Sequence, residues 1–243
     1  MHYLRSNWSL AWTIVFAGLI VASQPSIGRA DEQAACPSPS DAEHWSENIA
    51  AQECRMLLRF PDVARREGNR LIVSLASGRS IAFEDVGDRN STEYLDDGEY
   101  YYLDTIDTRS HVMRVWKVHV ESAGVLLLDY RSGEAFLTGD YPEASPDGQY
   151  YALGDASSGP IETFDIEVIR HREGHFQLVG HATRELCGFE RWATAPTFMM
   201  ICYDRPSDKV KQYRVAPDHR GGLVQTETGR ALSAEEQQVP YGH

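Results

Sequence analysis

Residues 99–138 read EYYYLDTIDTRSHVMRVWKVHVESAGVLLLDYRSGEAFLT. Apolar and polar side chains alternate through much of 99–107, 111–121 and 125–130, which is the period of a β-strand and not of a helix. The intervening Thr108-Arg109-Ser110 and Arg131-Ser132-Gly133 are built from turn-forming residues. The stretch therefore predicts consecutive antiparallel strands joined by short turns.

The second of these strands carries large side chains on both faces. Trp116, Val118 and Val120 share one face, and Met113 and Val115 share the other. A strand at the edge of a domain would leave one face polar. We therefore expect a central strand that is covered on both sides.

The same pattern extends in both directions along the chain. Further strands are expected at 71–76, 79–86, 134–138, 150–153, 163–170, 175–180, 191–195, 197–203, 209–215 and 223–228. Short strands with a turn signal every 8–14 residues or so are typical of antiparallel all-β domains. The fold class predicted is mainly β, an antiparallel propeller-like or sandwich domain with one N-terminal α-helix.

The helix is expected before the first strand. Ser40-Asp41-Ala42-Glu43 fits a capping box, in which the hydroxyl and the carboxylate satisfy free backbone N–H groups. Trp45, Ile49, Met56 and Phe60 follow at helical spacing, and Pro61 ends the run.

The N-terminus has the features of a secretory signal peptide. Arg5 precedes the apolar stretch 10–22, and Gly28-Arg29-Ala30 supplies small residues before a cleavage point at Asp31. An uncleaved anchor is the alternative, but thirteen apolar residues are short for the hydrocarbon core of a membrane. The prediction is an exported protein, periplasmic or extracellular, with no stable membrane insertion after signal cleavage.

Four segments follow from these boundaries. They are a signal peptide (1–30), an N-terminal helical segment (31–62), an antiparallel β domain (63–230) and a mobile tail (231–243). Removing residues 1–30 leaves 21 basic and 36 acidic side chains, a net charge of −15. This charge argues against nucleic-acid binding and favours a basic protein partner.

All four cysteines lie after the cleavage point. In an exported chain an even number indicates disulfides, and four cysteines allow three connectivities. We favour Cys36–Cys54 and Cys187–Cys202, because both pairs close short loops. No CxxC sequence supports a redox or zinc site.

The most specific phrase is Ser145-Pro146-Asp147-Gly148, followed by a strand from Tyr150. Pro146 presets the turn and Gly148 takes a positive φ. The phrase resembles the Ser-Pro-Asp-Gly start of a strand in β-propeller repeats of the Tol translocation propeller type, where it recurs in successive blades. Here it occurs once, and the resemblance implies a propeller-like blade with a role in protein–protein interaction.

Two groups of residues are candidate metal ligands. His171, His175 and His181 are spaced along one hairpin and are candidate transition-metal ligands, although Gly180 interrupts their register. His171-Arg172-Glu173-Gly174-His175 is not a metalloprotease helix, because the glutamate is one place late and Gly174 breaks the helix. The second candidate, for calcium, is the acidic loop with Asp85, Asp88, Asn90 and Glu93 and, just beyond, Asp96 and Asp97, although its spacing matches no EF-hand. No cofactor is expected.

Two tyrosine clusters are the candidate binding residues: Tyr100, Tyr101, Tyr102, Tyr150 and Tyr151. Neighbouring tyrosines in a strand point to opposite faces, so part of each cluster is expected at the surface, where tyrosine suits an interface. The alternative is that they fill a core.

The function predicted is an exported, non-catalytic binding protein, an inhibitor or immunity-type protein of the cell envelope. The competing prediction is a carboxylate-dependent hydrolase acting on glycan or peptide.

Overall fold

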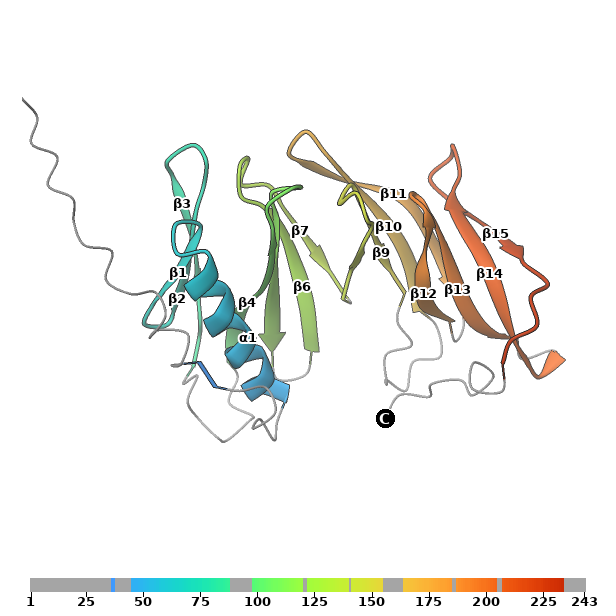
Figure 1. The fold of residues 1–243 in the computed structure, drawn as a ribbon, viewed down its shortest axis with the longest axis horizontal. Helices are drawn as coiled ribbons and strands as arrows, with labels where there is room; N and C mark the ends of the chain where they lie inside the picture. Colours follow the sequence, from blue (N-terminus) through green and yellow to red (C-terminus); the bar gives the residue numbers. More distant parts are fainter. Residues whose placement is uncertain are drawn as a thin grey trace, which may run out of the picture.

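The computed structural model describes residues 36–37, 45–87, 98–119, 122–139, 141–154, 164–184, 187–204 and 207–233. In these residues one helix is followed by four antiparallel sheets that succeed each other along the chain (Figure 1). The mainly β class with one N-terminal helix is thus confirmed.

The elements follow one another in this order: α1 (Trp45–Arg59); sheet 1, of β1 (Ala64–Glu67), β2 (Arg70–Ser74) and β3 (Ser80–Glu84); sheet 2, of β4 (Glu99–Asp107), β5 (Val112–His119), β6 (Ser122–Asp129) and β7 (Ala135–Thr138); sheet 3, of β8 (Glu143–Ala144), β9 (Tyr150–Leu153), β10 (Phe164–Arg172) and β11 (His175–Arg184); and sheet 4, of β12 (Cys187–Thr194), β13 (Thr197–Asp204), β14 (Lys209–Pro217) and β15 (Leu223–Glu227). Within every sheet each strand pairs with its neighbours in the sequence. Each sheet is therefore a simple meander.

The sheets pack on one another face to face and enclose three successive cores. The core between sheets 1 and 2 includes Leu71 and Met113, and that between sheets 2 and 3 includes Leu127 and Ile169. The third core, between sheets 3 and 4, is built around Phe198. Sheets 1 and 4 lie at opposite ends of the row (Figure 1).

The central strand predicted from the sequence is β5, and its coverage on both faces is confirmed. Val112 packs toward sheet 3, whereas its neighbours Met113 and Val115 pack toward sheet 1. All three side chains are buried.

Most strand predictions agree with the structure, and β4 and β9 have the predicted bounds. Two strands were missed, β1 and β8. The predicted turn 171–174 is shorter than expected, because β10 continues to Arg172 and only Glu173 and Gly174 form the loop. Both have positive φ, 55° and 83°, as a two-residue hairpin of the primed type requires.

The Ser145–Gly148 turn has the predicted geometry. The Gly148 N–H donates to the Ser145 carbonyl at 2.8 Å, and Gly148 has a φ of 68°. The Tyr150 N–H donates to the Ser145 hydroxyl at 2.9 Å, where β9 starts. The Ser145 side chain thus stabilises the turn that directly precedes β9.

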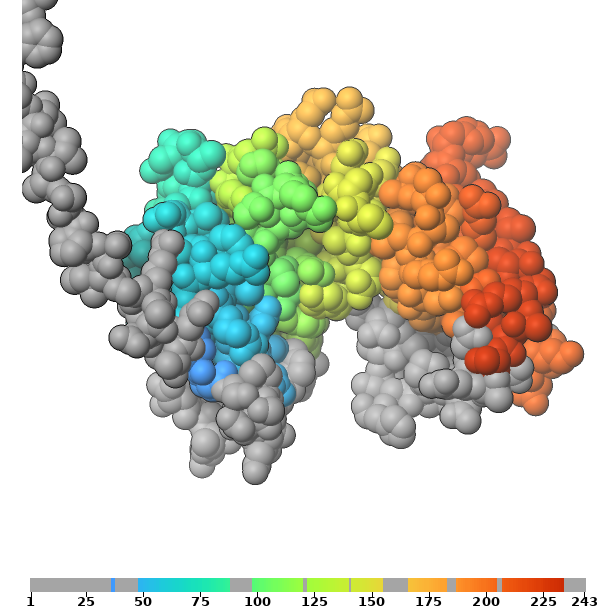
Figure 2. Space-filling model, viewed as in Figure 1, coloured from blue at the N-terminus to red at the C-terminus, as the bar shows by residue number. Residues whose placement is uncertain are grey.

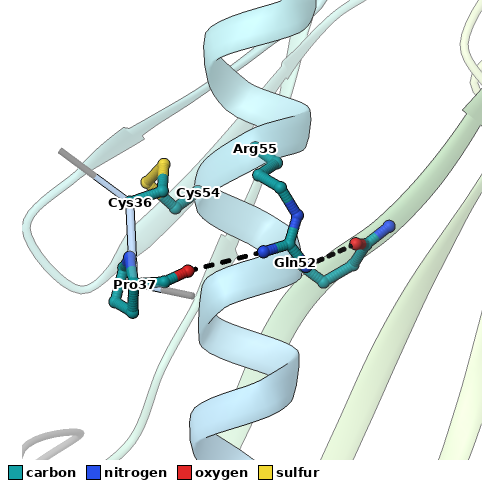
Figure 3. Close-up of a disulfide and its surroundings, with 5 residues drawn as sticks. All are labelled: Cys36, Pro37, Gln52, Cys54 and Arg55. Atoms are coloured by element: carbon teal, nitrogen blue, oxygen red, sulfur yellow. Dashed lines mark hydrogen bonds between the residues drawn. A yellow bond between two sulfur atoms is a disulfide. The ribbon is translucent and has the colours of Figure 1, made fainter. Parts of the chain in front are cut away.

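Helix α1 is fastened on two sides. Both predicted disulfides are confirmed, and Cys36–Cys54 ties the preceding segment to the helix (Figure 3). Beside it, Arg55 donates to the Pro37 carbonyl and to Gln52 (Figure 3). Gln52 in turn donates to the Asp104 carbonyl of β4 at 3.0 Å, so the helix lies against the edge of sheet 2.

The second disulfide, Cys187–Cys202, joins directly paired residues of β12 and β13. Two disulfides are typical of proteins from an oxidising compartment.

Several predictions fall outside the described residues: the signal peptide, the capping box at 40–43 and the tail from 234 onward. Residues 231–233 belong to no strand, and Leu232 is buried. In the described part of the chain no helix has the length and apolar character needed to cross a membrane.

Candidate interaction surface

Three hairpins from three successive sheets meet at one edge of the molecule. The Ala76 N–H, in the β2–β3 turn, donates to the Tyr130 carbonyl in the β6–β7 turn at 3.1 Å. The Ser132 hydroxyl in that turn donates to the Gly174 carbonyl in the β10–β11 turn at 2.8 Å. We call residues 75–79, 130–134 and 172–175 the hairpin rim; its turns project along the upper edge in Figures 1 and 2.

Glycines allow the turns to approach one another. A Cβ atom on Gly133 would lie 3.0 Å from Leu75 Cδ1, and one on Gly174 would lie 3.1 Å from Ser132 Cβ. Both glycines also have φ values near +84°, in the region that side chains rarely adopt. Each turn is therefore fitted to the turn of the preceding sheet.

A buried histidine–carboxylate contact lies beneath the rim. His171 Nε2 of β10 is 2.8 Å from Asp129 Oδ2 of β6, and both side chains are almost inaccessible. Asp129 Oδ1 accepts the N–H groups of Arg131 and Ser132, each at 2.8 Å. Burial raises the pKa of Asp129, but these N–H donors and His171 outweigh it and hold the pKa below its usual value. Asp129 thereby orders its own turn and fastens sheet 2 to sheet 3.

Glu134 makes a second link between the same two hairpins. Its Oε1 accepts the Phe176 N–H at 2.7 Å, and its Oε2 contacts His175 Nδ1. The Phe176 N–H, with help from His175, lowers the pKa of Glu134. Both carboxylates at this junction are therefore engaged in holding the turns together.

The arginines of the rim point to solvent instead. Arg79 and Arg131 lie in the first two turns and Arg172 lies directly before the third, and all are exposed. Arg172 makes only a loose pair with its neighbour Glu173 at 3.3 Å, with both side chains more than two-thirds exposed. The rim carries three arginines against two glutamates, on a chain with a strong negative charge. It can accept carboxylate or phosphate groups through guanidinium hydrogen bonds.

The predicted tyrosines lie mainly between the sheets. Tyr102 is 8% exposed and Tyr151 2%, and burial raises the pKa of Tyr151 to about 12. Tyr101 packs on the core between sheets 1 and 2, and Tyr150 packs on that between sheets 3 and 4. Tyr100 is half-buried. The structure does not bring the five rings together into one surface.

The three candidate metal-binding histidines also have separate surroundings. His171 pairs with Asp129, and His175 with Glu134. His181 is exposed on β11 beyond a bulge that shifts the register opposite Val168 and Ile169. Across the described ranges, no three residues of the His, Cys, Asp and Glu types gather closely enough to hold a metal.

In the acidic loop proposed for calcium, the described residue Asp85 is turned inward. Its Oδ2 pairs with Arg66 at 2.8 Å, and its Oδ1 accepts the Tyr101 N–H. Residues 88–97 of that loop lie outside the described residues.

Sequence reasoning missed the hairpin rim. A signal for it exists: an arginine stands within two residues of the turn glycine in Ser77-Gly78-Arg79, Arg131-Ser132-Gly133 and Arg172-Glu173-Gly174. The recurrence is short and its spacing irregular, so only the stacking of the sheets shows that the three turns adjoin.

No protein-family model matches the chain, and no curated protein matches it. The fold and the hairpin rim therefore define its class. The protein is a disulfide-bonded stack of antiparallel meander sheets, with hairpin turns that are hydrogen-bonded to one another along one edge.

Proposed function

We propose that the chain is an exported, non-catalytic binding protein of the cell envelope, of the inhibitor or immunity type. The observation that carries this proposal is the hairpin rim, in which exposed turns are held in fixed positions by hydrogen bonds between successive sheets. Turns held on a rigid scaffold are a common place for recognition. The exposed arginines add a residue type that is enriched in protein interfaces.

Charge and disulfides support the envelope as the location. The net charge of −15 after removal of residues 1–30 steers a basic protein partner toward the molecule and raises its association rate. Two disulfides suit the periplasm or the extracellular space. The proposal includes cleavage before Asp31, which N-terminal sequencing of the mature protein tests directly.

We further propose that the fold is propeller-like, an open row of blades, and not a two-layer sandwich. Three features support this: meander sheets in chain order, a separate core between each successive pair, and end sheets that lie apart (Figure 1). Blades of a propeller also stack in this way, each on the next.

The function is tested by capture from envelope extract on the immobilised mature protein. A single protein that is retained at low salt and released at high salt is purified, and its own activity is assayed with increasing amounts of this chain. Loss of that activity at one equivalent is the expected result. Steady turnover of a cell-wall glycan or peptide by this chain alone contradicts the proposal and supports a hydrolase.

A further inference from the structure

We propose that a cleft beside the start of β14 binds an extended peptide as an additional strand of sheet 4, with a carboxylate of the peptide against Lys209. The cleft has a volume of about 820 Å³ and is lined by residues 208–212 and 229–232 together with Tyr203 and Glu227. We call it the β14 cleft. This second binding site goes beyond the proposed function, because it belongs to sheet 4, which contributes nothing to the hairpin rim.

The cleft lies where β15 stops pairing with β14. Their last directly opposed residues are Tyr213 and Glu227, and the last backbone bond runs from the Thr228 N–H to the Gln212 carbonyl at 3.0 Å. Pairing ends at Gly229, which has a φ of 67°. The first residues of β14 therefore have β13 on one side and, within the part of the chain that the structure describes, no strand on the other.

The backbone of Val210 is directed toward this open side. In an antiparallel sheet the N–H and C=O groups of one residue point to the same neighbouring strand, and those of the next residue point to the opposite side. The Gln212 carbonyl points to β15, so the groups of Val210, two residues earlier in an unbroken register with β13, point the same way. A strand edge with such groups is a template for pairing with a further strand.

The charges of the lining favour a carboxylate. Three basic and two acidic side chains line the cleft of this otherwise acidic protein: Lys209, Lys211, Arg230, Asp208 and Glu227. Lys211 is bound by Asp204 at 2.8 Å and by Glu227 at 3.4 Å. Lys209, in contrast, is exposed and forms no ion pair with any described residue. An incoming carboxylate can therefore pair with Lys209 without displacing an existing partner.

Strand pairing fixes the positions that matter in the peptide. Directly opposed residues of an antiparallel pair have their side chains on the same face, and the faces alternate along a strand. A peptide antiparallel to β14 that places one residue opposite Val210 places the next residue, toward its C-terminus, opposite Lys209. We therefore expect a β-branched residue at the first of these positions. A carboxylate is expected at the second, from an acidic side chain or from the end of the peptide.

Labelled peptides test the carboxylate. Three peptides share the sequence Gly-Ser-Thr-Val and continue with glutamate and a C-terminal amide, with glutamine and an amide, or with glutamine and a free C-terminus. Anisotropy titration of the full mature protein is expected to show about two- to fivefold tighter binding of the first or the third peptide than of the second. The tighter of the two identifies the source of the carboxylate as a side chain or a chain end. Equal affinity for all three would overturn the proposal.

Methylation of the peptide backbone tests the strand pairing without a change to the protein. An N-methylated valine cannot donate to the Val210 carbonyl, so this peptide is expected to bind at least about fivefold more weakly. The control has the methyl group on the nitrogen of the following residue, whose N–H points away from β14. It is expected to lose less than about twofold in affinity. Equal losses for the two methylated peptides would contradict pairing with β14.

Substitution of Lys209 and hydrogen exchange locate the site. Lys209→Gln is expected to abolish the preference for the carboxylate, whereas Arg70→Gln, which removes one exposed positive charge from sheet 1, is expected to keep it. Saturation with the tighter peptide is expected to slow exchange of the Val210 N–H at least about tenfold in the natural protein. Slower exchange at the hairpin rim but not at Val210 would overturn the proposal. Self-association that protects Val210 without peptide would overturn it in favour of a second copy of the chain.

Discussion

Arg66 lies on β1, with its side chain turned away from solvent. Its guanidinium bonds Glu53 of α1 at 2.7 Å and Asp85 at 2.8 Å, and it also donates to the Tyr101 carbonyl. Glu53 accepts the Leu103 N–H at 3.0 Å. Three charged side chains thus satisfy backbone groups on the free edge of β4, which no strand covers among the described residues. The ion network fastens the helix, sheet 1 and sheet 2 to one another.

Replacement of Arg66 tests this network. Arg66→Gln is expected to lower the free energy of unfolding by about 3–5 kcal/mol, because two buried carboxylates lose their cation. The neighbouring Arg65→Gln breaks only an exposed pair with Glu67 and is expected to cost less than about 1 kcal/mol. Chemical denaturation of both variants measures the difference. Equal costs would show that the buried network contributes little beyond a surface pair.

Asp129 predicts a specific dependence of stability on pH. Its pKa in the folded protein is below the ordinary value of 3.8, so its contribution is complete well above pH 3.8 and is lost as pH falls through the folded pKa. Asp129→Asn is therefore expected to be less stable than the natural protein at pH 7, with the difference shrinking below about pH 4. Denaturation at pH 7 and pH 3 measures it. The exposed Asp62→Asn is the control, and a difference that stays constant with pH would contradict the role of Asp129.

At the scale of elements, the hairpins show how one sheet is fitted to the next. The β10–β11 turn contains only Glu173 and Gly174, both with positive φ. It rests on Ser132 of the preceding hairpin. Residue 174 must therefore adopt a left-handed backbone conformation, and it must have no side chain.

Substitution of three glycines by alanine separates these two requirements. Gly174→Ala is expected to cost about 2–4 kcal/mol, from backbone strain together with the close contact to Ser132. Gly68→Ala, also at positive φ but in open space, is expected to cost about 1 kcal/mol. Gly188→Ala, in open space without positive φ, is expected to leave stability unchanged or raise it by up to about 1 kcal/mol. Denaturant titration measures the free energy of unfolding of each variant. Equal losses for Gly174→Ala and Gly68→Ala would contradict a destabilising contact between residue 174 and Ser132.

Elements were predictable where alternation was regular. β4 was found with its true bounds, because its residues follow the strand period and end in a turn. β1 was missed, because its sequence Ala64-Arg65-Arg66-Glu67 places a charge on the inward face. The inward Arg66 is stabilised by the carboxylates of Glu53 in α1 and Asp85. These partners come from other parts of the chain, so no local sequence pattern can indicate them.

For the whole molecule, the two disulfides lie in different surroundings. Cys36–Cys54 fixes the segment before the helix, and Cys187–Cys202 lies within the core between sheets 3 and 4. The two pairs were predictable because the short loops suited neighbouring elements. Their burial differs, since Cys187 and Cys202 are almost inaccessible whereas Cys36 and Cys54 are half-buried.

Removal of each disulfide is expected to have unequal effects. A closed loop of about 15 residues contributes about 3 kcal/mol in the chain-entropy account, so C36A/C54A should lose roughly that amount. C187A/C202A should lose more, because two side chains also leave a packed core. Guanidinium unfolding of both double variants measures the two losses. A smaller loss in C187A/C202A would contradict the position of that disulfide in the core.

The sequence by itself determined the strand period, the turns and the helix, and it favoured the correct pairing among the three that the cysteines allow, because these features depend on residues close together in the chain. Alternation also showed that β5 would be covered on both faces. It could not show what covers a face, so the burial of Tyr151 and the inward position of Arg66 emerged only from the packing of one sheet on another. The contacts among the three turns of the hairpin rim have the same origin: residues tens of positions apart become neighbours only when their sheets stack.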